Sequence, residues 1–165
     1  MKIVLTFLLA CMAGTAAWAQ PGKTATYKTQ QTIPAVQLTD ISKQAFFANK
    51  VQTPGKTLVL VYFSPTCSHC IDFTDNLTGK LKQFKNVQFL FVSAYSLPEI
   101  QTFATNKGLT KMPQFKLAQD PEFKLGGFYE LKEIPSVFVY GKNGKLKKSF
   151  DSKVKMEDLI ASANE

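Results

Sequence analysis

The chain has 165 residues, of which 45% are hydrophobic, and it carries 20 basic against 12 acidic side chains. This length suits one domain, and the ordinary balance of hydrophobic and charged residues excludes a disordered or fibrous protein. Every basic residue other than the single histidine is a lysine, which excludes sites that need the bidentate fork of an arginine.

The first nineteen residues have the pattern of an export signal. Lys2 precedes an apolar run at 3–12, and an Ala-Trp-Ala exit ends the segment. The apolar run is about half the ~20 residues that a membrane-spanning helix needs. We therefore expect residues 1–19 to be a cleaved signal peptide and the mature protein to be soluble and periplasmic. A lipid anchor on Cys11 is disfavoured, because Leu9 fits poorly beside a lipidated cysteine.

The segment after the signal is polar, and a domain follows it. Residues 20–31 contain a proline and a glycine and are predicted to be a flexible lead-in. Residues 32–165 are the predicted domain. Its first strand is expected at 33–39, where Pro34 confines it to a sheet edge or a strand start. A weak helical pattern covers 41–50.

The strongest strand pattern in the chain lies at 58–63. It is continuously apolar, as expected for a strand that is buried on both faces. From Cys67 onward apolar residues recur every three or four positions, which indicates a helix. Another apolar strand covers 87–94. Strand, helix and strand with short links predict a βαβ unit with parallel pairing and a right-handed crossover.

The second half of the chain alternates helices and strands with clear start and stop signals. The predicted elements are a helix from Ser96 to Gly108, a strand at 115–118, a helix from Asp120 to Leu131, strands at 136–140 and 146–150, and a helix from Lys155. Ser96 and Glu99 form a capping-box pattern. Asn143-Gly144 between two β-rich runs predicts a hairpin.

The residues that carry chemistry are Cys67-Ser68-His69-Cys70, where the strand at 58–63 gives way to a helix. At a helix start the free backbone N–H groups and the positive end of the dipole stabilise a thiolate, which is the form that attacks disulfides. The spacing brings both sulfurs within bonding reach on one helical turn, so a Cys67–Cys70 disulfide is predicted. Cys67 is the expected nucleophile and Cys70, on the apolar stripe, the expected resolving thiol.

Other uses of this motif fit the sequence less well. A zinc site usually takes four ligands, whereas the mature chain offers two thiols and one histidine. A c-type haem site needs a histidine directly after the second cysteine, where Ile71 stands. We therefore predict no metal and no cofactor. A purely structural disulfide stays open, although closing so short a loop removes little chain entropy.

Several stretches resemble the thioredoxin superfamily. Residues 61–70 resemble its active-site stretch, and residues 134–145 resemble its cis-proline segment with the hairpin that follows. The stretches 33–40 and 118–131 resemble the lead-in strand and the inserted segment of the exported TlpA/ResA-like branch. The resemblance covers 33–165. It implies an α/β, thioredoxin-like fold with a central mixed β-sheet, flanking α-helices and an N-terminal lead-in strand.

The resemblance also implies a function and a set of site residues. It implies a thiol–disulfide oxidoreductase of the cell envelope, whose partners are exported protein thiols and disulfides and a membrane electron-transfer protein. Nucleic acid is not an expected partner, and no oligomeric state is predicted. The implied catalytic residues are Cys67, Cys70, His69 and Pro135, and the implied substrate contacts are Ile134 and Thr66. A cis Ile134–Pro135 bond would pack against the disulfide.

Departures from the family pattern leave the direction of exchange open. Thr66 stands where thioredoxins have a tryptophan, and Val61 stands where they have a buried acid. His69 beside a Cys67 thiolate would stabilise the reduced form and make the protein more oxidising, as in disulfide-introducing oxidases. TlpA/ResA-like proteins more often reduce, so we favour reduction.

Two further functions remain as alternatives. A peroxiredoxin-like peroxidase is disfavoured because the chain has no arginine, and because Ser64 replaces the threonine found three residues before the cysteine of those enzymes. A redox-inert, thioredoxin-like binding module would require that Cys67 does not react.

Overall fold

The structure is a computed structural model and describes residues 26–165. The predicted signal peptide and the first residues of the predicted lead-in lie outside this part. The end of that lead-in forms the helix α1 (Thr26–Gln30). Tyr27 packs against Tyr129 and Phe138, with ring centroids 5.7 and 5.5 Å apart. Within the described residues, no helix has the length and apolar character to cross a membrane.

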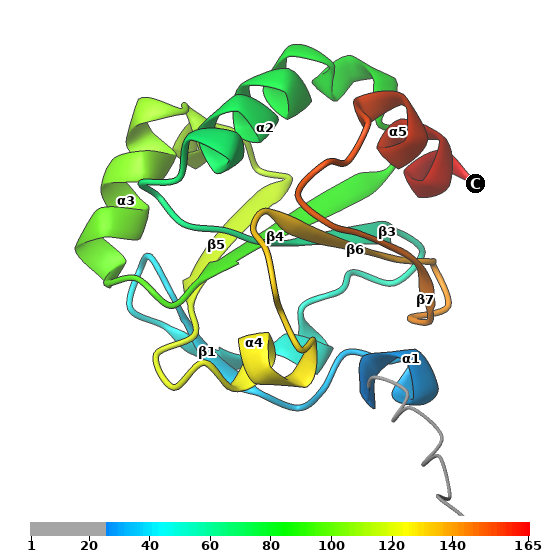
Figure 1. The fold of residues 1–165 in the computed structure, drawn as a ribbon, viewed down its shortest axis with the longest axis horizontal. Coiled ribbons are helices and arrows are strands. Elements are labelled where there is room, and N and C mark those ends of the chain that lie inside the picture. Colours follow the sequence, from blue (N-terminus) through cyan, green and yellow to red (C-terminus); the bar gives the residue numbers. More distant parts are fainter. Residues whose placement is uncertain (1–25) are drawn as a thin grey trace, which may run out of the picture.

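Seven strands form one mixed sheet in the order β2-β1-β5-β4-β3-β6-β7 (Figure 1). The strands are β1 (Gln37–Asp40), β2 (Ala45–Phe47), β3 (Thr57–Tyr62), β4 (Val87–Ser93), β5 (Phe115–Gln119), β6 (Ser136–Tyr140) and β7 (Leu146–Phe150). β3, β4 and β5 run parallel, and the other neighbouring pairs are antiparallel. The predicted βαβ unit and the hairpin of β6 and β7 are therefore confirmed.

Helices cover both faces of the sheet (Figure 1). The helices on one face are α2 (Ser68–Gly79), α3 (Leu97–Asn106) and α5 (Met156–Asn164), whereas α1 and α4 (Lys124–Phe128) lie on the other. Three short 3₁₀ turns are η1 (Ala48–Lys50), η2 (Leu81–Gln83) and η3 (Leu109–Lys111). The architecture is thus a three-layer α/β/α arrangement.

The central strand β3 separates two hydrophobic cores. Val59 and Val61 face the core under α2, α3 and α5, whereas Leu58 and Leu60 face the core under α4 and α1. All six residues of β3 are buried, which confirms a strand covered on both faces. Because this strand is held rigidly from two sides, the loop that follows it has a fixed starting point.

Local signals at α3 and at the hairpin behave as predicted. The capping box of Ser96 and Glu99 is present, and Gly108 ends the helix region with φ of 69°. Gly144 has φ of 74° in the turn between β6 and β7. Both glycines occupy the left-handed region that favours this residue.

The predicted helix at 41–50 is wrong. The Asp40 carboxylate accepts backbone N–H bonds from Ser42 and Gln44 at 2.9 and 3.0 Å, which closes a tight turn. The chain then returns as β2, antiparallel to β1. The predicted strand at 33–39 also begins later than expected, since β1 starts at Gln37.

The predicted helix from Asp120 to Leu131 is much shorter than expected. Phe123 lies in the left-handed region with φ of 54°, so the helical path cannot run through it from Asp120. Glu130, with φ of 52°, turns the chain again after α4. Only Lys124–Phe128 is helical.

Candidate active site

The two cysteines lie at the carboxyl end of β3 and differ in exposure. Cys67 is the N-cap residue of α2 and is partly exposed, whereas Cys70 is completely buried. Both are free thiols in the structure. The Cys67 N–H donates to the Ser64 carbonyl at 3.3 Å, and the Ile71 N–H donates to the Cys67 carbonyl at 3.0 Å. One thiol is thus accessible at a helix start, and the other lies beneath it.

Burial dominates the chemistry of Cys70. Desolvation raises the pKa of the Cys70 thiol to about 12, a hydrogen bond from the Ser64 backbone lowers it in part, and the adjacent Cys67 thiol raises it further. A thiol with this pKa stays protonated at neutral pH. Cys70 must therefore lose a proton during the step in which it attacks.

Three hydroxyl groups adjoin the nucleophile. Ser64 Oγ lies 3.1 Å from Thr66 Oγ1 and accepts the Thr66 N–H at 3.3 Å. Thr66 Oγ1 in turn donates to the Tyr95 hydroxyl at 3.4 Å. Hydrogen bonds from Ser64 and then Thr66 lower the pKa of Tyr95. Tyr95 was not predicted as a site residue, because its only signal in the sequence is its place just after the strand parallel to β3.

His69 lies on the first turn of α2 and is exposed. It borders a groove of about 370 Å³ together with Asp72 and Glu157. Among the described residues, no hydrogen bond or ion pair connects its ring to either thiol. The structure therefore places His69 on the first turn of α2 beside the cysteines without a hydrogen bond to the reacting sulfur, and its catalytic role stays a prediction.

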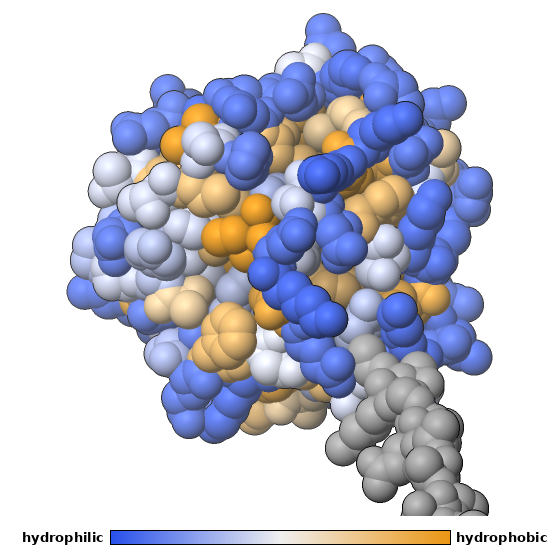
Figure 2. All heavy atoms as spheres, viewed as in Figure 1, coloured by the Kyte–Doolittle hydropathy of each residue, from blue (hydrophilic) through white to orange (hydrophobic). Residues whose placement is uncertain are grey.

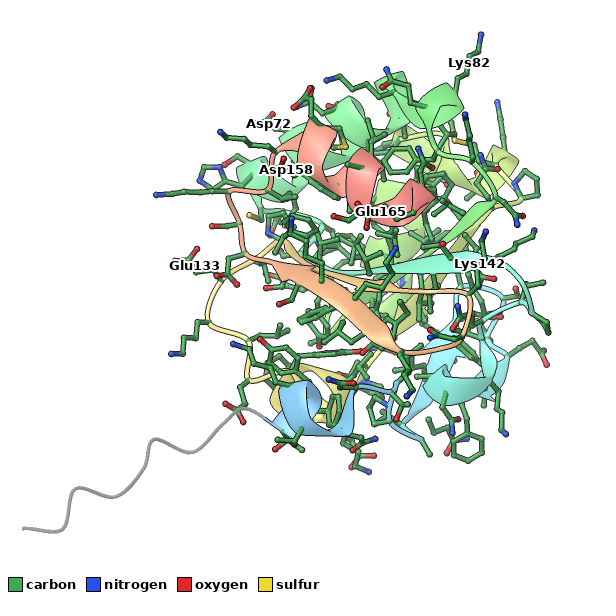
Figure 3. The ribbon with its side chains drawn as sticks, turned by 90° about the vertical axis from the view of Figure 1, so that its right-hand side faces the viewer. Asp72, Lys82, Glu133, Lys142, Asp158 and Glu165 are labelled. Atoms are coloured by element: carbon green, nitrogen blue, oxygen red, sulfur yellow. The ribbon has the colours of Figure 1, made fainter. Side chains whose placement is uncertain are left out.

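Two acidic side chains lie on the side of the molecule that carries the two site segments. Asp72 and Glu133, which flank the two site segments in the sequence, project from one side of the molecule, whereas Lys142 of the β6–β7 turn lies on the opposite side (Figure 3). Within residues 26–165, no group of three His, Cys, Asp or Glu side chains is arranged to hold a metal ion.

The segment before β6 is the second part of the site. The Ile134–Pro135 bond is cis, as the sequence resemblance implied. Pro135 is buried, and the next residue, Ser136, pairs with Tyr62 at the end of β3. Ile134 is half-buried, and no hydrogen bond among the described residues uses its backbone. Its N–H and C=O therefore have no backbone partner among the described residues, and the substrate contact predicted for Ile134 stays a prediction.

The sequence matches the AhpC/TSA family over residues 29–149. The chain belongs to the AhpC/TSA family. This membership confirms the predicted thioredoxin-like thiol–disulfide oxidoreductase class. No curated protein matches the sequence.

Solved structures confirm the thioredoxin-like fold of this AhpC/TSA member. A secreted Mycobacterium tuberculosis disulfide oxidoreductase homologous to E. coli DsbE is 17% identical with a TM-score of 0.64, covering 78% of this chain and 94% of its own. A putative protein disulfide isomerase from Bacteroides thetaiotaomicron is 17% identical with a TM-score of 0.67, covering 81% and 86%. The peroxidoxin BcpB of M. tuberculosis is 15% identical with a TM-score of 0.65, covering 81% and 96%.

The surface beside Thr66 carries a groove. Thr66 is exposed and borders a mainly apolar depression of about 540 Å³ between α2 and α3, where Ile71 and Phe103 form part of the lining. This position beside Cys67 agrees with the substrate contact predicted for Thr66, which stays a prediction.

The AhpC/TSA domain also contains a buried carboxylate that the sequence analysis did not single out. Asp120, 1% exposed, follows β5 and accepts a hydrogen bond from the Tyr62 hydroxyl at 3.1 Å. It also accepts backbone N–H bonds from Lys124, Leu125 and Gly126 at 2.9–3.1 Å. Burial, followed by the charge of Asp120, raises the pKa of Tyr62. Asp120 thereby ties the inserted segment to the strand that precedes Cys67.

Proposed function

We propose that the protein is an exported thiol–disulfide oxidoreductase that reduces disulfides in other exported proteins. The observation that carries the proposal is the pairing of a partly exposed Cys67 at a helix start with the buried Cys70. An accessible thiol can reach a substrate disulfide, and a buried neighbour can resolve the product. Export to the periplasm rests on the signal pattern at 1–19.

The proposed reaction has two exchange steps. The Cys67 thiolate attacks a substrate disulfide, the substrate S–S bond breaks, and one substrate sulfur leaves as a thiolate that takes up a proton. Cys70 then loses its proton and attacks the Cys67 sulfur, which releases the second substrate thiol and forms the Cys67–Cys70 disulfide. Two electrons pass to the substrate, and a membrane electron-transfer protein would return two electrons to the site.

The proposed direction, reduction, rests on the resemblance to TlpA/ResA-like proteins and on the contacts of His69. A strong oxidant has an unusually stable reduced form. An ordinary thiol and the buried Cys70 thiol are both protonated at neutral pH, so the raised pKa of Cys70 does not decide the direction of exchange. His69, which the sequence analysis connected with an oxidising site, makes no hydrogen bond or ion pair with either thiol among the described residues. The alternative is an oxidase that uses the same cysteines, and a measurement of the direction of exchange would distinguish it from a reductase.

The residues around Cys67 have proposed roles in binding. We assign the free backbone of Ile134 to pairing with an extended substrate, next to the buried Pro135. We assign the exposed Thr66, which directly precedes Cys67, to a second contact with the substrate. An extended chain bound by backbone hydrogen bonds suits many sequences, because it needs no particular side chain.

The experiment that tests this function is trapping of the mixed disulfide. The Cys70→Ser protein should accumulate a covalent complex with a disulfide-bonded peptide through Cys67, detected by intact mass. The Cys67→Ser protein should accumulate none and should lose multiple-turnover reduction. Equal trapping by both variants would contradict the assigned roles, and absence of trapping by either would contradict the reductase.

A peroxidase is a second candidate because the family match includes the AhpC/TSA name. Ser64 is buried three residues before Cys67, but its hydroxyl already contacts Thr66, and the chain contains no arginine. Hydrogen peroxide added to the dithiol protein should therefore disappear slowly. Rapid consumption would favour the peroxidase.

A further inference from the structure

Phe123 combines an exposed aromatic side chain with an unfavourable backbone. Phe123 is one of the exposed large apolar residues, with a relative exposure of 46%. Its backbone has φ of 54° and ψ of 24°, in the left-handed region that bulky residues rarely adopt. A backbone outlier that the surroundings hold in place is a reason to look for a function.

The surrounding loop holds Phe123 firmly in this conformation. The Phe123 N–H donates to the Asp120 carbonyl at 3.1 Å, and the Gly127 N–H donates to the Phe123 carbonyl at 2.8 Å. The ring lies against Gly126, where an added Cβ would come within 2.3 Å of it. The buried Asp120 carboxylate fixes the next turn of backbone. These contacts therefore fix the position of the exposed Phe123 ring.

The ring lies at the same sheet edge as the cysteines. It contacts the Tyr62 ring edge-on, with centroids 5.7 Å apart. Tyr62 ends β3 five residues before Cys67 and pairs with Ser136, the residue after Pro135. Figure 2 shows apolar side chains exposed on the face between α2, α3 and α4. The contacts through Tyr62 therefore connect Phe123 to both segments of the proposed site.

We propose that Phe123 is a specificity-determining residue, which binds a large apolar side chain next to the reacting cysteine of a polypeptide substrate. This inference rests on the proposed reductase function. A polypeptide that is joined to Cys67 and paired with the Ile134 backbone extends along the edge that carries Phe123. A phenyl ring offers no hydrogen-bond partner, so contact with an apolar side chain is the interaction that removes its surface from water.

The test compares three substrates of the purified dithiol protein, with dithiothreitol supplying the electrons for repeated turnover. Two are short peptide disulfides that differ only in having leucine or serine beside the cysteine, and the third is glutathione disulfide. The variant is Phe123→Asn, because asparagine tolerates the left-handed backbone and removes the ring. Phe47→Asn is the matched control, since Phe47 is 50% exposed and lies on β2 at the far end of the sheet.

Phe123→Asn should lower kcat/KM for the leucine peptide about 10-fold, mainly through KM, which is the scale of losing one apolar pocket contact. It should change the serine peptide and glutathione disulfide less than about twofold. Phe47→Asn should leave all three unchanged. Phe123→Tyr should keep the preference for leucine, because it keeps the ring.

Two outcomes would overturn the proposal. Equal loss on all three substrates would mean that Phe123 acts only on the structure of the site, and an unchanged leucine preference in Phe123→Asn would mean that the ring does not read the substrate. Failure of the proposed function is distinguishable, because the unaltered protein would then fail to reduce glutathione disulfide and both peptides. If Phe123→Asn does not fold, Phe123→Gly, which also removes the ring and tolerates the left-handed backbone, replaces it in the comparison with Phe123→Tyr, and equal leucine preference in all proteins overturns the proposal.

Discussion

Two loops at the carboxyl edge of the sheet are built in different ways. The loop after β3 carries Cys67 and is held by short-range bonds, such as those from the Thr66 and Cys67 N–H groups to Ser64. The loop after β5 carries no thiol and is held by the Asp120 carboxylate and its bond to Tyr62, 58 residues away in sequence. The first loop supplies the chemistry, and the second fixes the exposed ring of Phe123. The loop that carries Cys67 is held by local bonds, whereas the loop that carries the exposed ring depends on a long-range anchor.

The largest effect should come from removing the anchor of the second loop. Asp120→Ala leaves the Tyr62 hydroxyl and three backbone N–H groups without their acceptor. We expect it to lower the free energy of unfolding by about 3–5 kcal/mol, the usual cost of breaking a buried charged network. Urea unfolding measures this, with the exposed Asp151→Ala as control. A loss below about 1 kcal/mol would contradict the anchoring role.

The first loop should make stability depend on alkaline pH through Cys70. Its pKa is raised to about 12 in the folded protein, so the folded state binds more protons than the unfolded state between the ordinary thiol pKa and 12. Stability should therefore fall as pH rises from about 9 towards 12, by at most ~1.4 kcal/mol per pH unit. The reduced Cys70→Ala protein should lack this component of the slope. Parallel pH profiles for the two proteins would show that burial does not perturb Cys70.

Tyr62→Phe tests whether the Asp120 network affects only the stability of the fold or also the reactivity of Cys67. It removes one hydrogen bond to the carboxylate while leaving the three backbone bonds in place. We expect a loss of about 1–2 kcal/mol in the free energy of unfolding and little change in the alkylation rate of Cys67. A large fall in alkylation rate would mean that the two loops are not independent.

The smallest effect should follow Tyr95→Phe. The hydroxyl is exposed, and its bond to Thr66 is long at 3.4 Å. Alkylation of Cys67 across the pH range should stay within about twofold of the unaltered protein, because an exposed hydrogen bond exchanges readily with water. A larger shift of the alkylation profile would show that the hydroxyl chain controls the nucleophile.

The contrast between local and long-range contacts explains which elements could be predicted from the sequence. Three elements were predicted correctly: the strand at 58–63, the helix after Cys67 and the Asn143-Gly144 hairpin. Each of them depends on residues that are neighbours in the sequence. The helix predictions for 41–50 and 120–131 were wrong because the carboxylates of Asp40 and Asp120 accept backbone N–H bonds and redirect the chain.

The residues of the candidate site also fall into those that the local sequence predicts and those that depend on long-range contacts. Cys67 and Cys70 stand in a recognisable motif, so their placement at the end of β3 could be predicted. Tyr95 and Phe123 reach the same edge only because strands distant in sequence lie together in the sheet. Nothing in the local sequence distinguishes Phe123 from a core phenylalanine until its backbone conformation and exposure are known.

The most direct test of the account is the reduction potential of the Cys67–Cys70 pair. The protein would be equilibrated in thiol–disulfide buffers, quenched with an alkylating reagent and analysed by intact mass. A value near the ~−270 mV of thioredoxin is expected, because among the described residues His69 makes no hydrogen bond or ion pair that would stabilise a thiolate in the reduced form. A value near the ~−120 mV of a strong disulfide donor would contradict the proposed reductase, and thiols that do not exchange would contradict an enzyme at this site.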